Sequence, residues 1–232
     1  MDISKQTAFV SGANRGLGRQ LVLELLSRGA TVYAGARNPE NMDLPGAIPV
    51  KLDITDPHSV EAVSEIAKNV TLLINNAGVS TGTSLISGDM ENIHTEMNTH
   101  FFGTLAMVRS FAPIISMNGG GTILNVLSVL SWYSSEGEGA YSVAKSAEWA
   151  LTNAMRLELA DQRIHVAGLH VGYMDTDLAA SVIAPKLNPA DVAKITINGL
   201  EMDQSEILAD EVSKTVQQGL AGGVLALYPQ FA

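Results

Sequence analysis

Tyr141 and Lys145 have the side chains and the spacing that proton transfer requires. They are four residues apart in the segment SEGEGAYSVAKSAEWALTNAMRLEL, which has a helical pattern, so both lie on one helix face. A free tyrosine has a pKa of about 10 and is a poor base at neutral pH. Because a nearby cation favours the ionised phenol, we expect Lys145 to lower the pKa of Tyr141. The same spacing also fits an ordinary pair on a helix surface, and only the rest of the chain distinguishes the two.

Ser128 precedes Tyr141 by 13 residues (141 − 128) and ends the apolar run TILNVLS, which reads as a strand. Its hydroxyl can donate a hydrogen bond to a substrate oxygen and orient it beside the tyrosine. Ser131, Ser134 and Ser135 lie nearby but lack this strand-end position. Tyr141 would then give a proton to a carbonyl oxygen or take one from an alcohol.

Short apolar runs alternate with helical patterns along the chain, which predicts right-handed βαβ units. The expected strands are residues 7–12, 31–36, 47–52, 71–78, 122–128, 163–172 and 222–228, and the expected helices are 16–29, 56–69, 90–117, 140–159 and 205–220. We therefore predict an α/β fold, a Rossmann-type doubly wound sheet of about seven parallel strands with helices on both faces. Ligands of such sheets bind at the carboxyl ends of the strands.

Three glycines, Gly12, Gly16 and Gly18, form the pattern G-x-x-x-G-x-G between the first expected strand and the first helix. Glycine permits a tight turn and a close approach of backbone to a pyrophosphate, and the helix N-terminus presents N–H groups to the phosphates. A plain strand–helix turn is also rich in glycine, but the position of this loop favours dinucleotide binding.

The residues around the end of the second strand predict which dinucleotide binds. Ala36 and Arg37 stand there, and neither is the acid that would bind a ribose 2′-hydroxyl. Arg15 lies in the glycine loop, and two guanidinium groups at one corner suit a 2′-phosphate. The sequence thus favours NADP(H) over NAD(H). Asp53, after the third strand, either binds the adenine amino group or is simply an acid at a helix N-terminus.

The composition excludes several classes of protein. The chain has 232 residues, of which 46% are hydrophobic and 16% charged, so disorder is not expected. A net charge of −10 argues against a nucleic-acid or anionic-membrane partner. There is no cysteine, and the five histidines lack ligand spacing, so we expect no metal. We see no signal peptide and no membrane span, and we expect a cytoplasmic protein.

Taken together, these motifs resemble the short-chain dehydrogenase/reductase family. The resemblance covers nearly the whole chain: the glycine loop, NNAG at Asn75–Gly78, Asn98 in the long helix, Ser128, and the Y-x-x-x-K of Tyr141 and Lys145. It implies reversible hydride transfer between a nicotinamide and an alcohol or carbonyl. It also implies that Lys145 binds the nicotinamide ribose and that Asn98 holds a water in a proton relay. The nearby His100 is interpreted as a helix-packing residue rather than a second base.

One position departs from the family, which usually has a Pro–Gly pair after the sixth strand. Val171 precedes Gly172 here, so a fixed φ is lost and the loop is expected to be more mobile. Thr176 in this loop can still reach a pyrophosphate or carboxamide. The expected catalytic residues are Asn98, Ser128, Tyr141 and Lys145. The expected cofactor-binding residues are Gly12, Asn14, Arg15, Gly16, Leu17, Gly18, Arg37, Asp53, Ile54, Asn75, Ala77, Gly78, Tyr141, Lys145, Gly172, Met174 and Thr176.

The substrate is expected to be a hydrophobic ketone or aldehyde, reduced with NADPH. The segments that should form its pocket carry Trp132, Tyr133, Tyr173 and Leu178, although each of these also fits ordinary packing; Ser128 and Tyr141 complete the expected substrate-binding set. A 3-oxoacyl carrier-protein or thioester reductase ranks second, because the acidic chain would repel an acidic carrier protein. A non-catalytic NADP(H)-sensing regulator is the alternative from another class.

The length suits one domain, residues 1–232. Its cofactor-binding part is expected to span about 1–125, and its catalytic and substrate-binding part about 126–232. By the same resemblance, the helices that carry Asn98 and Tyr141 pair between subunits, so a homodimer or homotetramer is expected.

Overall fold

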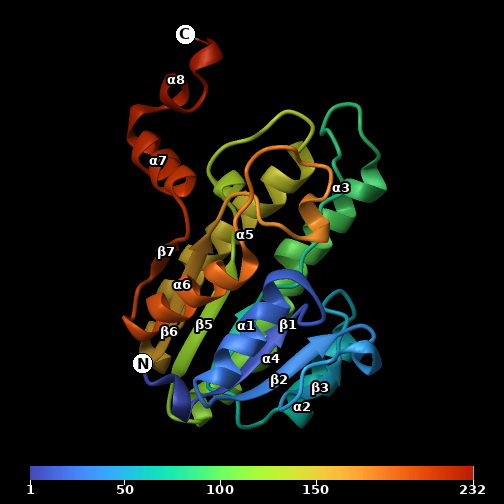
Figure 1. Cartoon of the computed structure of the whole chain (residues 1–232), viewed down its shortest axis with the longest axis vertical. Coiled ribbons are helices and arrows are strands. Elements are labelled where there is room, and N and C mark those ends of the chain that lie inside the picture. The colour runs from blue at the N-terminus through green and yellow to red at the C-terminus, as the bar shows by residue number, and fades with distance from the viewer. Residues whose placement is uncertain (232) are drawn as a thin grey trace.

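A parallel β-sheet with helices on both faces forms the body of the computed structural model, which describes residues 1–231 (Figure 1). The strands are β1 (Thr7–Ser11), β2 (Thr31–Ala36), β3 (Ile48–Lys51), β4 (Leu72–Asn75), β5 (Gly121–Val126), β6 (Ile164–His170) and β7 (Glu206–Leu208). The helices are α1 (Gly16–Ser27), α2 (Pro57–Ile66), α3 (Met90–Met97), α4 (Thr104–Met117), α5 (Gly139–Glu158), α6 (Pro189–Glu201), α7 (Glu211–Gly219) and α8 (Val224–Leu227).

The strand order is β3-β2-β1-β4-β5-β6-β7, and every pairing is parallel. The predicted seven-stranded Rossmann-type sheet is therefore confirmed. From β1 the chain adds β2 and β3 on one side of the sheet and then β4 to β7 on the other side. The loops after β1 and β4 therefore meet at the carboxyl edge, where the strand order reverses. Asn76 joins them, because its side-chain amide donates to the backbone oxygens of Ser11 and Gly12 at 2.9 and 3.2 Å.

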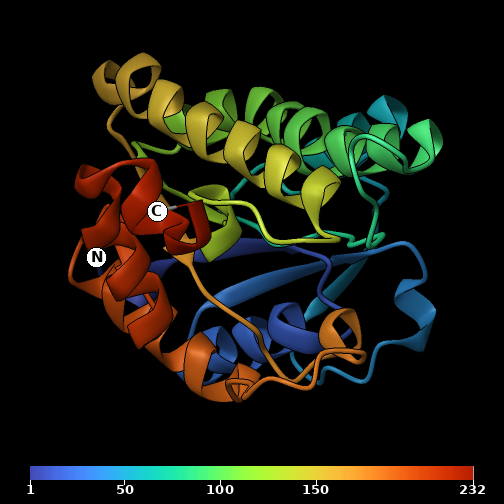
Figure 2. The ribbon, with the colours of Figure 1, turned by 90° about the horizontal axis from the view of Figure 1, so that it is seen from above.

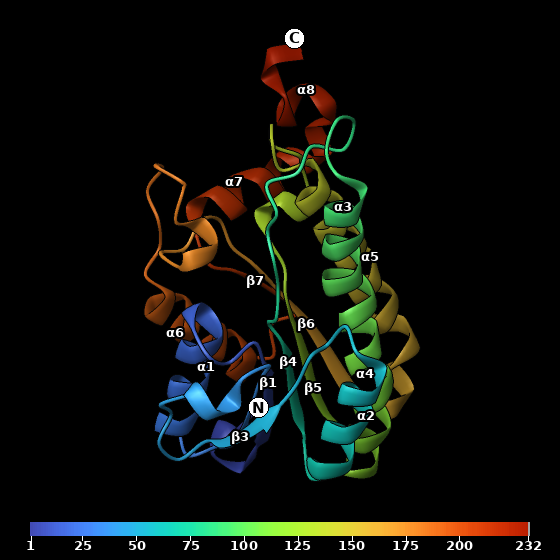
Figure 3. The same cartoon turned by 90° about the vertical axis from the view of Figure 1, so that its right-hand side faces the viewer.

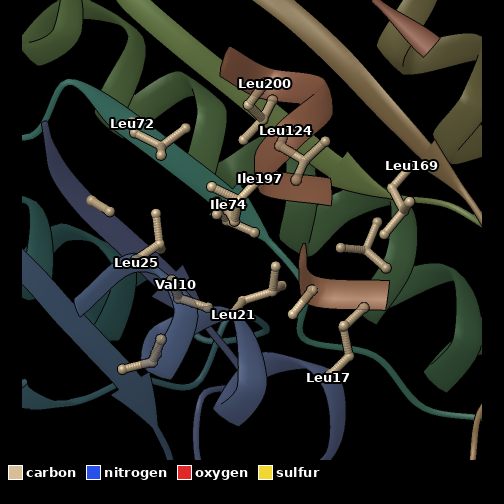
Figure 4. Close-up of a cluster of buried hydrophobic side chains, with 14 of the residues drawn as sticks. Val10, Leu17, Leu21, Leu25, Leu72, Ile74, Leu124, Leu169, Ile197 and Leu200 are labelled. Atoms are coloured by element: carbon tan, nitrogen blue, oxygen red, sulfur yellow. The ribbon is translucent and has the colours of Figure 1, made fainter. Parts of the chain in front are cut away.

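Two hydrophobic cores lie on opposite faces of the sheet. Successive strand residues point to opposite faces, so Leu72 and Ile74 of β4 enter one core and Leu73 enters the other. Helices α1 and α6 cover the first face, and α2, α4 and α5 cover the second (Figures 2 and 3). In Figure 4, Leu21 and Leu25 of α1 are drawn in the first core. The buried strand residues are mostly apolar, as a sheet covered on both sides requires, and Asn75 and Asn125 are among the polar exceptions.

The C-terminal region differs from the prediction. The last strand is Glu206–Leu208, inside the segment expected to be helical, and the expected strand at 222–228 contains the helix α8. Three residues are enough for an edge strand, since only Ile207 is fully buried. The apolar side chains of α8 stay largely exposed (Val224 62%), and this helix projects beyond the sheet (Figure 1). The helix α6 was not predicted either.

The helical stretch expected at 90–117 begins and ends at these residues, but it is not one continuous α-helix. Between α3 and α4, residues Asn98–Gly103 form a π-helical segment. The wider turn of a π segment changes which side chains face a neighbouring element, and such segments often mark functional sites.

No helix in residues 1–231 has the length and apolar character needed to cross a membrane.

Candidate active site

Ser128 and Tyr141 meet at the carboxyl edge of the sheet, where the Ser128 hydroxyl acts to lower the pKa of Tyr141. Tyr141 lies in the first turn of α5, and Ser128 follows β5. The oxygen of Ser128 also accepts the N–H of Leu130 at 3.1 Å, so it caps a short 3₁₀ turn and is held in place. Ser131, one of the alternative serines, instead accepts the backbone N–H of Ser128 at 3.2 Å.

Lys145 lies one turn after Tyr141, as its spacing predicted, and its side chain is buried. The ammonium nitrogen is 5.8 Å from the centre of the Tyr141 ring. It donates to the backbone oxygen of Val126 and to Oε2 of Glu148, both at 2.7 Å. The Tyr141–Lys145 pair is therefore not a surface pair. Glu148 is a buried partner of Lys145 that the sequence interpretation missed, although it stands three residues after the lysine.

The pKa of Tyr141 is raised, which corrects the expectation that Lys145 would lower it. Burial is the largest cause, because it disfavours the charged phenolate. Lys145 and the hydrogen bond from Ser128 act in the expected direction, but the charge of Glu148 opposes them. The site as it stands therefore favours a protonated phenol.

The charge of Lys145 is stabilised despite its burial. Burial by itself would lower the pKa of this lysine, but the attraction of Glu148, followed by that of Tyr141 and Glu96, raises it. Lys145 thus remains a cation next to the tyrosine. Its ammonium nitrogen is held in one place by the two acceptors, Val126 and Glu148.

The structure does not bring Asn98 to Tyr141. The side chain of Asn98 is exposed at the start of the π-helical segment, whereas His100, two residues later, is buried. The His100 ring meets the Tyr141 ring edge-on, with 5.3 Å between their centres and an angle of 89°. The wider π turn places His100, and not Asn98, on the face toward α5. His100 is therefore buried and packed between helices as expected, and the residue it packs against is Tyr141.

The glycine loop has the shape that a pyrophosphate needs. Gly12 and Gly16 have φ of +66° and +53°, which favour glycine. A Cβ at Gly18 would overlap the backbone oxygen of Gly12 and the side chain of Asn76. Helix α1 begins after Arg15 without a side-chain cap, so its first N–H groups are free for phosphate oxygens. These features fit a bound dinucleotide.

The remaining loop residues divide between exposed and core positions. Asn14 is exposed, whereas Leu17 is 4% exposed and packs in the first hydrophobic core. The side chain of Leu17 therefore belongs to the core, and only its backbone remains at the loop.

The two arginines expected at the cofactor's ribose have different surroundings. Arg37 is exposed, and its charge helps to lower the pKa of Asp53, although hydrogen bonding from Thr55 is the larger cause. Arg15 instead forms an exposed ion pair with Asp177, with 2.8 Å between Nη1 and Oδ2. An exposed pair of this kind is weak, so Arg15 can leave it for a phosphate.

Asp53 itself is half-buried, and its Oδ1 accepts the N–H and hydroxyl of Thr55 at 2.9 and 2.7 Å. The neighbouring Ile54 is buried against Gly103 of the π-helical segment. The structure thus orients the Asp53 carboxylate at the carboxyl edge, beyond β3.

The NNAG loop holds the glycine loop from the other side. Asn75 lies inside the sheet, where its amide donates to Asn125 at 2.8 Å. The N–H of Ala77 donates to the hydroxyl of Ser11 at 3.1 Å. Gly78 lies against the His100 ring, and a Cβ there would come within 2.8 Å of Cε1. This loop therefore connects the predicted cofactor loop with the His100 side of the site.

The loop after β6 also reaches the glycine loop. Thr176 lies so close to Gly16 that a Cβ on this glycine would meet its Cγ2 at 3.2 Å. Gly172 is held by its N–H, which donates to Asp210 at 2.6 Å, and Met174 pairs with Leu187 in an isolated bridge. Asp210 and Leu187 thus hold the loop that lacks the usual proline.

The residues predicted to bind substrate fall into two groups. Trp132 is 8% exposed and stacks on His170, with 3.7 Å between ring centres, so little of its side chain is free to contact a substrate. Burial raises the pKa of Tyr133, and the nearby Tyr173 and Tyr228 act in the same direction. Tyr228, from the C-terminal segment, joins them: its ring centre is 6.3 Å from that of Tyr133. Its hydroxyl oxygen accepts the N–H of Ser134 at 2.6 Å.

Sequence reasoning assigned Tyr228 to a strand and missed this contact. Leu178 is 46% exposed and contributes apolar surface in the loop after β6.

Across residues 1–231, no group of three or more His, Cys, Asp or Glu side chains has the geometry to hold a metal ion.

Comparison with known proteins gives consistent matches. The short chain dehydrogenase family model matches residues 6–186. The crystal structure of a short chain dehydrogenase from Burkholderia cenocepacia J2315 in complex with NADP is 36% identical, with a TM-score of 0.95 over 99% of this chain and 98% of that chain.

Two curated relatives are from Schizosaccharomyces pombe. The NADP-dependent 3-hydroxy acid dehydrogenase is 27% identical over 94% of this chain and 96% of its own length. The NADPH-dependent 1-acyldihydroxyacetone phosphate reductase is 31% identical over 77% of this chain and 62% of its own length.

Proposed function

The chain belongs to the short-chain dehydrogenase/reductase family, and from that premise we propose that it is an NADPH-dependent reductase that converts a ketone or aldehyde into an alcohol. The observation that carries the proposal is the position of Tyr141. Its phenol is close enough to Ser128 for that hydroxyl to act on its pKa, its ring lies 5.8 Å from the ammonium of Lys145, and it stands at the sheet edge that carries the glycine loop.

The proposed roles of the side chains follow from this geometry. When bound, the reduced nicotinamide supplies the hydride. Tyr141 donates its proton to the carbonyl oxygen, and Ser128 donates a hydrogen bond to the same oxygen. Lys145 stabilises the negative charge that develops on Tyr141. Because the pKa of Tyr141 is raised, the phenol is protonated at neutral pH, which suits the direction of reduction.

NADP(H) is the proposed cofactor, and two observations support it: the arginines of this chain and the cofactor bound to a solved relative. Arg37 is exposed just after β2, where an acidic residue would favour NAD(H), and Arg15 is held only by a surface ion pair. The solved relative described above was crystallised with NADP. The uncapped N-terminus of α1 and the tight approach at Gly18 fit the pyrophosphate of either dinucleotide.

The proposed substrate is a small hydrophobic carbonyl compound. Tyr133, Tyr173 and Tyr228 gather near the loop that carries Ser128, and Leu178 adds apolar surface to the loop after β6. Tyrosine rings offer a large apolar contact area and a polar edge. This combination suits an aryl or alkyl ketone better than a sugar or another strongly polar substrate.

A 3-oxoacyl compound is the second candidate substrate. The observation that favours it is that one curated relative is a 3-hydroxy acid dehydrogenase, since oxidation of a 3-hydroxy acid gives a 3-oxo acid. A carrier-bound form is less favoured, since Glu136 is exposed and Glu138, which accepts the Ser80 hydroxyl at 3.1 Å, precedes Tyr141 by three residues. Such negative charges would repel an acidic carrier protein.

We also propose a homodimer or homotetramer. Phe102 is 55% exposed beside a shallow groove that Pro57, Leu105 and Arg109 line, and Leu157 of α5 is 82% exposed. A second copy that packs on α4 and α5 would bury these side chains. Light scattering after gel filtration measures the mass, and a monomer at micromolar concentration would reject this part of the proposal.

The experiment that tests the function is a spectrophotometric screen. Oxidation of NADPH and NADH is followed over aryl ketones, aldehydes and acetoacetyl thioesters, with wild type beside Tyr141→Phe. Turnover that prefers NADPH and is lost in the variant supports the proposal. NADPH binding without turnover of any of these compounds would favour the cofactor-sensing regulator.

A further inference from the structure

The two arginines expected to bind one 2′-phosphate face different carboxylates. Nη1 of Arg15 is 2.8 Å from Oδ2 of Asp177, and this ion pair joins residues that are 162 positions apart in the chain. Hydrogen bonding from Thr55 is the main cause of the lowered pKa of Asp53, and the charge of Arg37 adds to it, so Arg37 faces Asp53. Arg15 is therefore already engaged before any cofactor binds.

The sheet topology separates the two carboxylates. Arg37 follows β2, which lies on one side of β1, whereas Asp177 belongs to the loop after β6, a strand on the other side of β1. Arg15 precedes α1, in the glycine loop that follows β1. Its ion pair thus engages the guanidinium with the loop after β6 rather than with the residues at the end of β2.

Both partners of this ion pair stand on ordered backbone. Arg15 is the N-cap residue of α1. Asp177 begins the 3₁₀ turn Asp177–Ala179, and Ala179 is buried. The preceding residue, Thr176, lies against Gly16, as the close approach of its Cγ2 shows. The ion pair therefore fastens the loop after β6 to the glycine loop where the two loops already lie together.

Arginine binds a carboxylate and a phosphate through the same N–H groups. A dinucleotide with a 2′-phosphate must therefore take Arg15 from Asp177, whereas one with a 2′-hydroxyl has no need of this arginine. The affinity for the phosphorylated cofactor is reduced by the fraction of molecules in which Arg15 is free. The two side chains are 62% and 72% exposed, so the ion pair is weak and can exchange its anion.

We propose that Asp177 is a specificity-determining residue that competes with the 2′-phosphate of NADP(H) for Arg15. The proposal rests on the proposed cofactor, and it does not depend on which carbonyl compound is reduced. When the phosphate binds, the Arg15–Asp177 pair breaks and an Arg15–phosphate pair forms in its place. The preference for NADP(H) over NAD(H) is therefore smaller than an unoccupied Arg15 would give.

Calorimetric titration of the full chain with adenosine 2′,5′-bisphosphate and with adenosine 5′-phosphate tests the competition without substrate or turnover. Asp177→Asn should bind the bisphosphate about two- to sixfold more tightly than wild type, the range for release of a weak exposed pair. Its affinity for the 5′-phosphate should equal that of wild type. The gain should shrink as salt is added, because salt screens exposed charges. A bisphosphate affinity equal to that of wild type would overturn the proposal.

Asp175→Asn is the matched control. Asp175 is exposed two residues earlier in the same loop, and it is not the partner of Arg15. This variant therefore measures what the loss of one negative charge from the loop does by itself, and its bisphosphate affinity should stay close to that of wild type. An equal gain in Asp175→Asn and Asp177→Asn would mean that no specific competition exists.

The double variant Arg15→Leu, Asp177→Asn isolates the pair. Without Arg15 there is nothing to compete for, so Asp177→Asn should give no gain in bisphosphate affinity over Arg15→Leu alone. The same gain in this background would show that Asp177 repels the phosphate directly, and it would reject the proposal. These affinities are measured without a carbonyl substrate, so a failure of the reductase function and a failure of this proposal are separate results.

Discussion

Lys145 and Glu148 form a buried ion pair three residues apart on α5, with 2.7 Å between the ammonium nitrogen and Oε2. Their side chains are 6% and 2% exposed, so water screens the pair very little. Glu148 is tied further by the hydroxyl of Thr104, which donates to Oε1 at 3.0 Å. The cation beside Tyr141 is therefore held in place by the protein itself.

Removal of one partner of this pair should cost more stability than removal of both. Lys145→Met leaves the Glu148 charge buried without compensation, and we expect a loss of about 3–5 kcal/mol in the free energy of unfolding. The double variant Lys145→Met, Glu148→Leu should recover a large part of that loss, because no charge remains to be buried. Denaturant titration measures both. A double variant less stable than the single variant would contradict this account.

The raised pKa of Tyr141 predicts the pH dependence of both directions of the reaction. Burial and the charge of Glu148 hold the phenol protonated above its ordinary pKa of about 10. Reduction needs the protonated form, so its kcat/KM should stay level from neutral pH to beyond pH 10 and then fall. Oxidation of the alcohol needs the deprotonated form and should rise across the same range. A reductive profile that already falls near pH 8 would show that another group controls it.

Arg37 should decide the preference for NADPH. Loss of a charge-assisted hydrogen bond of about 1.5–3 kcal/mol corresponds to roughly a ten- to hundredfold change. Arg37→Leu should raise the KM for NADPH by that factor and leave the KM for NADH nearly unchanged. Arg109→Leu is the control, since Arg109 is exposed on α4, outside the glycine loop and the strand ends. If Arg37→Leu changed the KM for NADPH and the KM for NADH by the same factor, Arg37 would not be the residue that binds the 2′-phosphate.

His170 should make the protein lose stability in mild acid. Burial lowers its pKa from 6.5 to about 4, and Arg156 and Lys145 act in the same direction, while the backbone oxygen of Ser128 opposes them. Between these two values the unfolded chain binds a proton that the folded protein does not. Stability is therefore complete above pH 6.5 and falls as the pH drops toward 4, by about 3 kcal/mol at about 1.4 kcal/mol per pH unit.

The measurement is urea unfolding at a series of pH values, with His170→Gln beside wild type. The variant should lose this part of the pH dependence, whereas His58→Gln, which alters an exposed histidine of α2, should keep it. An unchanged slope in His170→Gln would mean that other groups cause the loss in acid.

Features with a local cause could be predicted from the sequence. Strand and helix periods, the glycines after β1, and the spacing of Tyr141 and Lys145 all depend on residues close together in the chain. These features determined the doubly wound sheet and the position of the tyrosine at its carboxyl edge. The C-terminal region was assigned wrongly for the same reason. The apolar run at 222–228 looks like a strand locally, but the last place in the sheet belongs to Glu206–Leu208, which pairs with β6.

The surroundings of the tyrosine were decided by the tertiary structure. Glu96, His100 and Glu148 come from separate turns, and only the packing of α3 and the π-helical segment against α5 brings them together. The π turn makes His100, and not Asn98, face Tyr141, and helical spacing alone does not reveal where such a turn occurs. Burial then reverses the expected direction of the Tyr141 pKa, because the cost of charging a group depends on everything packed around it. The sequence by itself therefore determined which side chain we propose as the proton donor. Long-range packing decided the charges that control it.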